Sequence, residues 1–318
     1  MQGLAAMGAH TLLPANVTIH GRTLAQILDA HLAWIEKQPG AARADLTGGT
    51  LNELRLVRAN LAGALLARTT WLDSDLSGAD LSGALLEQVD FRQTALSGAD
   101  LTGAEMQEAL CDQTWMPGAN LSEATLQAAS FRQANLEGAR FLDAKIYETV
   151  FTGATLKNTG FHHAKAFQAL FVEAHIENAL FYHARLQMCR FAGSRLNGAN
   201  FSMAQAADCD FVNADLSQAK FHKADLSRAV LVGVIARDAD FRETKLGSAD
   251  FNASMFSGAR FGGAVLTAAD LRGADLRNAR ELTPEQLIHA RTDQSTTLPN
   301  GTKGPYLRHS GAERPLMR

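Results

Sequence analysis

The sequence predicts an all-β solenoid built from four-sided coils. Three observations support this prediction: an unbroken five-residue repeat from Ala44 to Asn278, a large apolar residue at the third position of most repeats, and a phenylalanine that recurs every ten residues. A period of five fits neither a helix nor a flat strand, but it fits a chain that turns a corner every five residues. One repeat cannot bury its apolar residue alone, so the repeats must stack.

The composition of each repeat position indicates which side chains point inward. The 47 repeats begin at residues whose numbers end in 4 or 9, and the first position is Ala in 32 of them. The third position holds 23 Leu and 15 Phe, so positions one and three face the interior and the other three face solvent. We expect the largest third-position residues to form the core: Trp71, Phe131, Phe141, Phe151, Phe161, Phe171, Phe181, Phe191, Phe201, Phe211 and Phe221.

The phenylalanine spacing predicts the number of sides in a coil. Between Phe131 and Phe221 a Phe occurs every ten residues. A three-sided coil would carry Phe through every wall, whereas a coil of four repeats places Phe on two opposite walls. On a 20-residue coil, 14 of the 15 third-position Phe residues lie on two opposing walls, and Phe256 is the exception.

The repeats ADLSG, ADLTG, ANLEG and ADLRG resemble those of the pentapeptide-repeat family. The resemblance covers residues 44–278. It implies a right-handed quadrilateral β-helix, and 47 repeats would form about 12 coils.

Both ends of the repeat region carry segments typical of caps, which cover the exposed edges of a solenoid. In the N-terminal segment, 1–43, residues 23–38 predict a helix with Thr23 as N-cap and a stop at Pro39. Its expected apolar face is Leu24, Ile27, Leu28, Leu32 and Ile35. Residues 279–299 predict a C-terminal cap with a short helix that begins at Thr283 and Pro284. Residues 300–318 have little to bury and predict a mobile tail.

The bulk properties exclude several classes of protein. A net charge of -3 and 46% hydrophobic residues fit a soluble protein and argue against direct nucleic-acid binding. No stretch has the length of a membrane span, and the first residues do not read as a signal peptide. Three cysteines do not form a disulfide framework, which favours a cytoplasmic location. Cys189 and Cys209 are 20 residues apart and point inward, so buried free thiols are expected.

No catalytic motif is present: the sequence contains no nucleophile elbow, P-loop, dinucleotide fingerprint or HExxH. The regular repeat also leaves no loops on which to place catalytic groups. We therefore expect a protein that is not an enzyme and has no cofactor.

One wall has apolar residues at outward positions where polar residues are usual. The interface candidates on this wall are Val150, Leu170, Val172, Val212, Val230 and Val232. Exposed apolar stripes often mark interfaces, although β-branched residues are also tolerated on a flat wall.

A second and weaker candidate is a metal site. Asp143, His163 and His183 share one corner on successive coils, and such residues can bind a metal ion. An ordinary solvated corner is the favoured interpretation, because no second shell of orienting groups is visible.

The leading functional hypothesis is a non-catalytic protein-interaction or scaffold module, with an unknown protein partner or a homodimer. An alternative follows from the family resemblance, because some relatives are DNA-mimicking proteins that bind and protect the topoisomerase gyrase. Residues 44–123 hold 12 acidic and four basic residues, which fits a mimic, whereas the net basic segment 124–198 does not. A secreted bacterial effector or an immunity partner is a further alternative.

Overall fold

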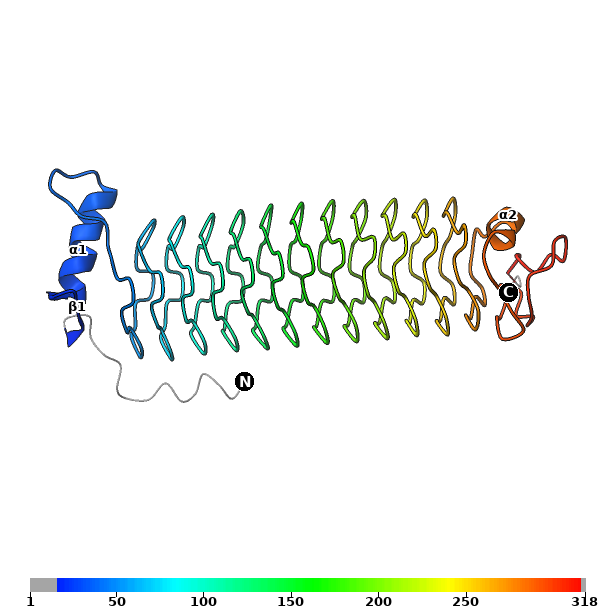
Figure 1. Cartoon of the computed structure of the whole chain (residues 1–318), viewed down its shortest axis with the longest axis horizontal. Helices are drawn as coiled ribbons and strands as arrows, with labels where there is room; N and C mark the ends of the chain where they lie inside the picture. Colours follow the sequence, from blue (N-terminus) through cyan, green and yellow to red (C-terminus); the bar gives the residue numbers. More distant parts are fainter. Residues whose placement is uncertain (1–15, 316–318) are drawn as a thin grey trace. The chain divides into compact units, whose positions relative to one another are not determined.

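The computed structural model describes residues 16–315, and the chain forms two compact units, Met1–Thr155 and Leu156–Arg318. Each unit contains a stack of coils, and consecutive coils are drawn as successive loops of the ribbon (Figure 1). Among the described residues, none of the helices has the length and apolar character needed to cross a membrane.

The helices and named strands lie outside the repeats. The first unit begins with an antiparallel hairpin of β1 (Thr18–Ile19) and β2 (Arg22–Thr23), followed by helix α1 (Leu24–Ile35). The second unit contains helix α2 (Pro284–Ile288).

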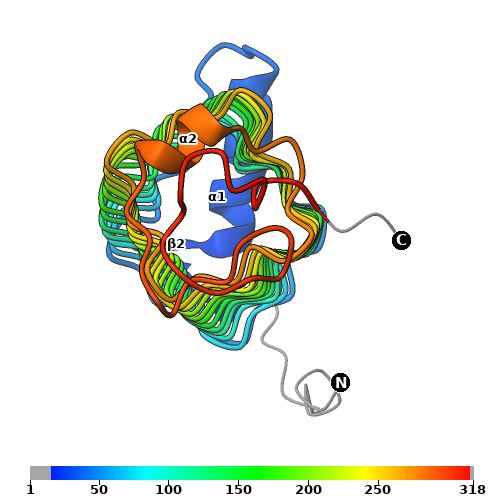
Figure 2. The ribbon, with the colours of Figure 1, turned by 90° about the vertical axis from the view of Figure 1, so that its right-hand side faces the viewer.

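Backbone hydrogen bonds between consecutive coils set the size of each coil. In the first unit Asp45 pairs with Leu65, and in the second unit Lys165 pairs with Arg185, each as an isolated parallel β-bridge. All bridges within the repeats join residues 20 positions apart, so one coil contains four repeats and has four walls. Viewed end-on, the coils of the second unit have a roughly square outline (Figure 2).

The extended segment of each wall is shorter than an ordinary β-strand, although the sequence predicts an all-β fold. Each wall contributes a single bridge at the second position of the repeat, and a turn follows at the fourth and fifth positions. Between two corners only three residues are extended, which is too few for a longer ladder. The corners also pair between coils: the amide of Gly48, at φ 69°, donates to the carbonyl of Ala67 at 2.9 Å. The solenoid is therefore confirmed, with bridges in place of long strands.

Aromatic rings fill the interior from two opposite walls. Trp71 and the ten Phe residues between Phe131 and Phe221 are fully buried. In the second unit, Phe171, Phe191 and Phe211 stack in one column with ring centroids 4.8 and 4.9 Å apart. Phe181 belongs to the opposite column and meets Phe171 and Phe191 edge-on at 6.0 and 5.9 Å. Stacked and edge-to-face geometries are both favourable for aromatic pairs.

Buried hydroxyl groups at the first position donate either to a carbonyl three residues earlier, as Ser194 does to Phe191, or to the preceding coil. Thr94 donates to the carbonyl of Trp71 at 2.7 Å, and Thr244 donates to the carbonyl of Phe221 at 2.7 Å. Both bonds span 23 residues, so the same geometry recurs in both units. A small polar residue therefore replaces Ala at this position without leaving an unpaired buried group.

Helix α1 begins at a capping box, in which Thr23 Oγ1 accepts from the amide of Gln26 and the Gln26 side chain accepts from the amide of Thr23. Its buried side chains are Leu24, Ile27 and His31, which lie on one face. The predicted apolar face was therefore partly wrong, because the helix is rotated so that Leu32 is 45% exposed. His31 occupies the buried place, and its Nδ1 accepts the amide of Ala44 at 3.1 Å.

Helix α2 is also held by a capping box, formed by Thr283 and Gln286. The Gln286 amide group donates to the carbonyls of Phe261 and Ala264, both at 2.8 Å. Leu287 is buried. The short helix is thus bonded to the coil edge that it follows, and Figure 2 shows it lying along that edge.

Residues 300–315 are folded, in contrast to the expected mobile tail. The amide of Asn300 donates to the carbonyl of Ala312, and the Tyr306 hydroxyl donates to Glu313 at 3.0 Å. Tyr306 and Glu313 are both buried. Ala312 is buried as well, so this segment buries side chains despite its polar composition. Residues 1–15 and 316–318, which belong to the predicted end segments, lie outside the described residues.

We expect Phe191→Ala to lower the stability of the protein strongly. The substitution removes two stacked and two edge-on ring contacts and leaves a cavity, which costs about 3–5 kcal/mol for a buried Phe. Phe167→Ala is the matched control, because Phe167 lies at a fourth position and is 42% exposed. Denaturant and thermal midpoints of the two variants test this expectation, and equal midpoints would contradict the core assignment.

We expect stability to fall in acid through His31. Burial lowers the pKa of His31 below its usual 6.5, and the Arg43 charge lowers it further. The unfolded chain therefore binds the proton first as the pH falls. The stabilisation is complete above about pH 6.5 and is lost as the pH falls through the folded-state pKa.

His31→Gln provides the comparison, because a Gln side chain can accept the Ala44 amide without titrating. Thermal midpoints measured over this pH range should change less in the variant than in the parent protein. The same pH dependence in both proteins would show that other groups are responsible.

Candidate interaction surface

The main candidate surface lies on one wall of the second unit. It combines two adjacent columns of outward residues from four consecutive coils, and we call it the apolar wall. Its members at the second and fourth repeat positions are Leu170, Val172, Arg190, Ala192, Asp210, Val212, Val230 and Val232.

Backbone bonds place these two columns in order. Leu170 bridges to Arg190, Arg190 to Asp210, and Asp210 to Val230. At the adjoining corners, the amide of Glu173 donates to the carbonyl of Ala192, and that of Asn213 donates to the carbonyl of Val232. The structure therefore brings together the five predicted interface residues of the second unit, Leu170, Val172, Val212, Val230 and Val232.

The apolar wall has a rigid support. The stacked column of Phe171, Phe191 and Phe211 lies on its inner side, since each of these rings belongs to the same repeat as a wall residue. The amide of Phe191 donates to the carbonyl of Asp210 at 2.6 Å, and that of Phe211 donates to the carbonyl of Val230 at 2.7 Å. A partner would thus meet a surface that is already ordered, which limits the entropy lost on binding.

Most of the apolar residues on this wall are half-buried, and Val230 is 37% exposed. One ion pair lies in the middle of the wall, where Arg190 Nε is 3.5 Å from Asp210 Oδ2. Asp210 Oδ1 also accepts the amide of Val212 at 3.0 Å, so this carboxylate is oriented by the backbone. A Coulombic pair in such an exposed position contributes little to folding.

Val150 belongs to the first unit, where it bridges to Ser130, and Ser130 bridges in turn to Leu110. Leu110 is 39% exposed and Trp115, in the next repeat, is 41% exposed. The sequence analysis missed Trp115. The signal was available, because a tryptophan at a second position must face outward.

The metal candidates occur in different units. Asp143 lies in the first unit, and His163 and His183 lie in the second. The two imidazole rings are exposed and stack at 5.3 Å with an interplanar angle of 6°, and Tyr182 meets His183 edge-on at 4.3 Å. Within residues 16–315 the structure has no group of three or more His, Cys, Asp or Glu side chains that could hold a metal ion.

The three cysteines are buried free thiols. Burial raises the pKa of Cys189 to about 12 and raises the pKa of Cys111 and of Cys209 well above the usual value. Cys209 Sγ donates to the carbonyl of Leu186 at 2.8 Å. Thiols in this state are poor nucleophiles.

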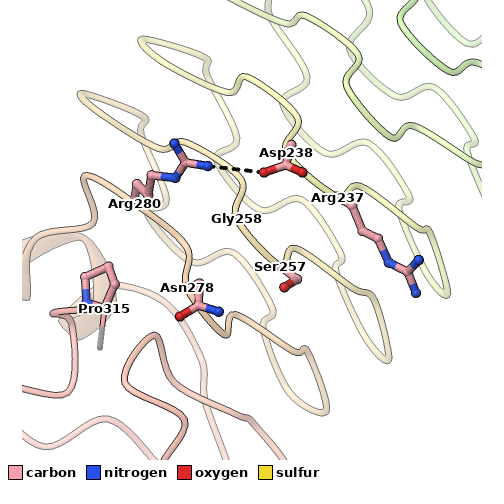
Figure 3. A pocket seen from close by; sticks show the side chains of 7 residues that line it. All are labelled: Arg237, Asp238, Ser257, Gly258, Asn278, Arg280 and Pro315. Atoms are coloured by element: carbon pink, nitrogen blue, oxygen red, sulfur yellow. Dashed lines mark hydrogen bonds and ion pairs between the residues drawn. The ribbon is translucent and has the colours of Figure 1, made fainter. Parts of the chain in front are cut away.

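A polar hollow of about 580 Å³ lies near the end of the second unit. Figure 3 shows Arg280 directed at Asp238 across the hollow, at 3.2 Å, while Arg237 points away from them. Gly258 lies between them at φ 74°, and a Cβ there would collide with Asp238 Oδ1. Ser257 also lines the hollow.

Comparison with known sequences identifies the family. The family described as "Pentapeptide repeat region" matches residues 124–201. The family described as "Pentapeptide repeats (8 copies)" matches residues 74–110, 104–143, 209–247 and 244–280. These segments cover more than half of the chain. The chain belongs to the pentapeptide repeat family. This confirms the resemblance inferred from the repeats. No curated protein matches the sequence.

Several solved pentapeptide repeat structures are similar to this chain. HetL, involved in heterocyst differentiation regulation in the cyanobacterium Nostoc sp. strain PCC 7120, is 24% identical, with 85% of this chain and 97% of HetL covered and a TM-score of 0.32. Full-length QnrB1, a plasmid-mediated fluoroquinolone resistance protein, is 19% identical over 63% of this chain and 91% of QnrB1, with a TM-score of 0.27. A thylakoid-lumen protein of Arabidopsis thaliana is 22% identical over 36% of this chain and 66% of its own length, with a TM-score of 0.27.

Proposed function

We propose that this pentapeptide repeat protein is a non-catalytic protein-interaction module and that the apolar wall is its binding face. The contiguous apolar surface of Leu170, Val172, Val212, Val230 and Val232 is the observation that supports this function most directly. Contiguous exposed apolar patches are uncommon on monomeric proteins and often mark sites of association. The valine side chains have few rotatable bonds, so they can be desolvated at little conformational cost.

The chemistry of the remaining candidates also favours binding over catalysis. The thiols are buried and held in the protonated form. In the hollow near Arg280, the Asp238 carboxylate is paired with the Arg280 guanidinium. Catalysis by a nucleophile would require an activating base within hydrogen-bond reach.

We further propose that α1 and α2 act as caps for a repeat domain of residues 44–278. His31 contacts the amide of Ala44, at the start of the first repeat, and Gln286 occupies two carbonyls near the last repeats. Covering such edges prevents pairing with other chains. Under this proposal residues 279–299 belong to the C-terminal cap, and residues 300–315 extend it.

We expect the double variant Leu170→Asp with Val172→Asp to lose association without unfolding. Asp is accepted at second positions, because its side chain bonds the amide two residues later, as Asp210 does to Val212. Two buried charges in an interface would oppose binding strongly. Asn200→Asp with Ser202→Asp is the matched control, since it adds the same charges at the same repeat positions of another wall.

Affinity capture, light scattering and thermal melting of the three proteins test this function. The parent protein and the control should associate, with a partner or with themselves, and the wall variant should not, while all three melt alike. Equal association by all three proteins would show that the apolar wall is not the binding face.

The acidic character of residues 44–123 favours a second candidate, a DNA-mimicking protein that binds gyrase. This segment carries 12 acidic and four basic residues. If the candidate is correct, the protein should change gyrase supercoiling activity, and neutralising substitutions in this segment should abolish the effect. If gyrase activity does not change and the wall variant loses association, the gyrase proposal is rejected and only the interaction-module proposal remains.

A further inference from the structure

The apolar wall is complementary to itself under a two-fold rotation. Its four coils follow a symmetric pattern: two apolar residues, then a basic residue beside Ala, then an acidic residue beside Val, then two apolar residues. We propose that the wall binds a second copy of this chain, with the two solenoid axes antiparallel. This inference rests on the proposed function, because it names the partner of the same face.

The two-fold axis lies in the interface, perpendicular to the solenoid axes and midway between the coils of Arg190 and Asp210. The rotation exchanges the first coil of the wall with the fourth and the second with the third. Leu170 of one copy then faces Val230 of the other, and Val172 faces Val232. Coil spacing is the same in both copies, about 4.8 Å, so all four coils come into register together.

The charges select the antiparallel arrangement. In it, Arg190 of each copy faces Asp210 of the other, in addition to its own Asp210 at 3.5 Å. The two pairs form an alternating group of four charges at the centre of the interface. A parallel arrangement would instead place Arg190 beside Arg190 and Asp210 beside Asp210, and like charges directly opposite each other are destabilising.

The sizes of the fourth-position side chains agree with this arrangement. Under the two-fold rotation the small Ala192 of each copy faces the larger Val212 of the other. An isologous interface requires self-complementarity of this kind.

Charge exchange provides the test. Arg190→Asp alone places two acidic groups opposite each other at both central contacts, and Asp210→Arg alone places two basic groups there. We expect either single variant to weaken dimerisation by roughly tenfold or more. A mixture of the two variants should form heterodimers, since every central contact then joins opposite charges, and the double variant Arg190→Asp with Asp210→Arg should dimerise again by itself.

Sedimentation velocity of the full chain over a range of concentrations measures the dimer, and native mass spectrometry of differently tagged variants measures the heterodimer. Lys245→Asp is the control, because Lys245 and Asp225 form a similar pair at 3.7 Å on another wall. This control should dimerise like the parent protein. Thermal midpoints of all variants should agree closely, because exposed pairs contribute little to folding.

A covalent trap gives a second measurement. Leu170 and Val230 are three coils apart in one chain, about 14 Å, which exceeds the reach of a disulfide. The variant Leu170→Cys with Val230→Cys should therefore form only intermolecular disulfides, and we expect a covalent dimer after mild oxidation. Lys165→Cys with Asp225→Cys has the same spacing on another wall and should form no covalent dimer. The three natural thiols are buried and should not interfere.

The outcomes separate this inference from the proposed function. A parent protein that is monomeric at all concentrations, or a dimer that is unaffected by the charge variants, overturns self-association through this wall. The proposed function is then tested separately: the parent protein should capture another protein, and the variant Leu170→Asp with Val172→Asp should not. Rescue in the mixed variants, with the covalent dimer, supports the antiparallel pair.

Discussion

Hydrogen bonding between residues 20 positions apart is the constraint on which the rest of the structure depends. Each second-position residue bonds the preceding coil through both its amide and its carbonyl, as Leu65 does with Ala44 and Leu46, and the corners also pair between coils, as Gly48 does with Ala67. Side chains with equal places in the coil therefore form columns. Residues of one chemical type can therefore line up over several coils without any loop. Such columns form both the aromatic core and the outer surfaces.

In the interior, the columns determine how the aromatic rings pack. Phe rings on two opposite walls meet in the middle, stacking within their column and meeting the other column edge-on. Apart from Phe256, the third positions of the walls between them carry no Phe, so the cross-section is filled without rings on all four sides. Outside, the same regularity aligns Leu170, Arg190, Asp210 and Val230 on a surface whose backbone cannot easily adjust.

Repetition explains how much of this structure was predictable. The period, the inward positions and the opposed Phe walls follow from the sequence because each repeat adds the same signal, and Thr23 and Thr283 were recognisable as helix caps. The unique contacts at the ends were not predictable. The buried face of α1 includes His31, whose Nδ1 accepts the amide of Ala44, and the Tyr306 hydroxyl donates to Glu313 within residues 300–315. Neither contact follows from the repeat pattern.

The candidate surface was predictable for a related reason. An apolar residue at an outward position stands out against the repeat, which identified Leu170, Val172 and Val230. Its symmetry was less visible in the sequence, since it requires knowing which columns adjoin and where the ion pair of Arg190 and Asp210 lies.

The paired Phe columns also restrict how such a chain can change its length during evolution. Loss or gain of one residue would turn every later core residue outward. A change of five would keep the inward positions but rotate the later Phe residues onto the walls that carry Leu, and a change of ten would restore the rings while reversing the outer faces. Only steps of 20 residues preserve both, so lengthening by whole coils is the one route that leaves the core and the surfaces intact.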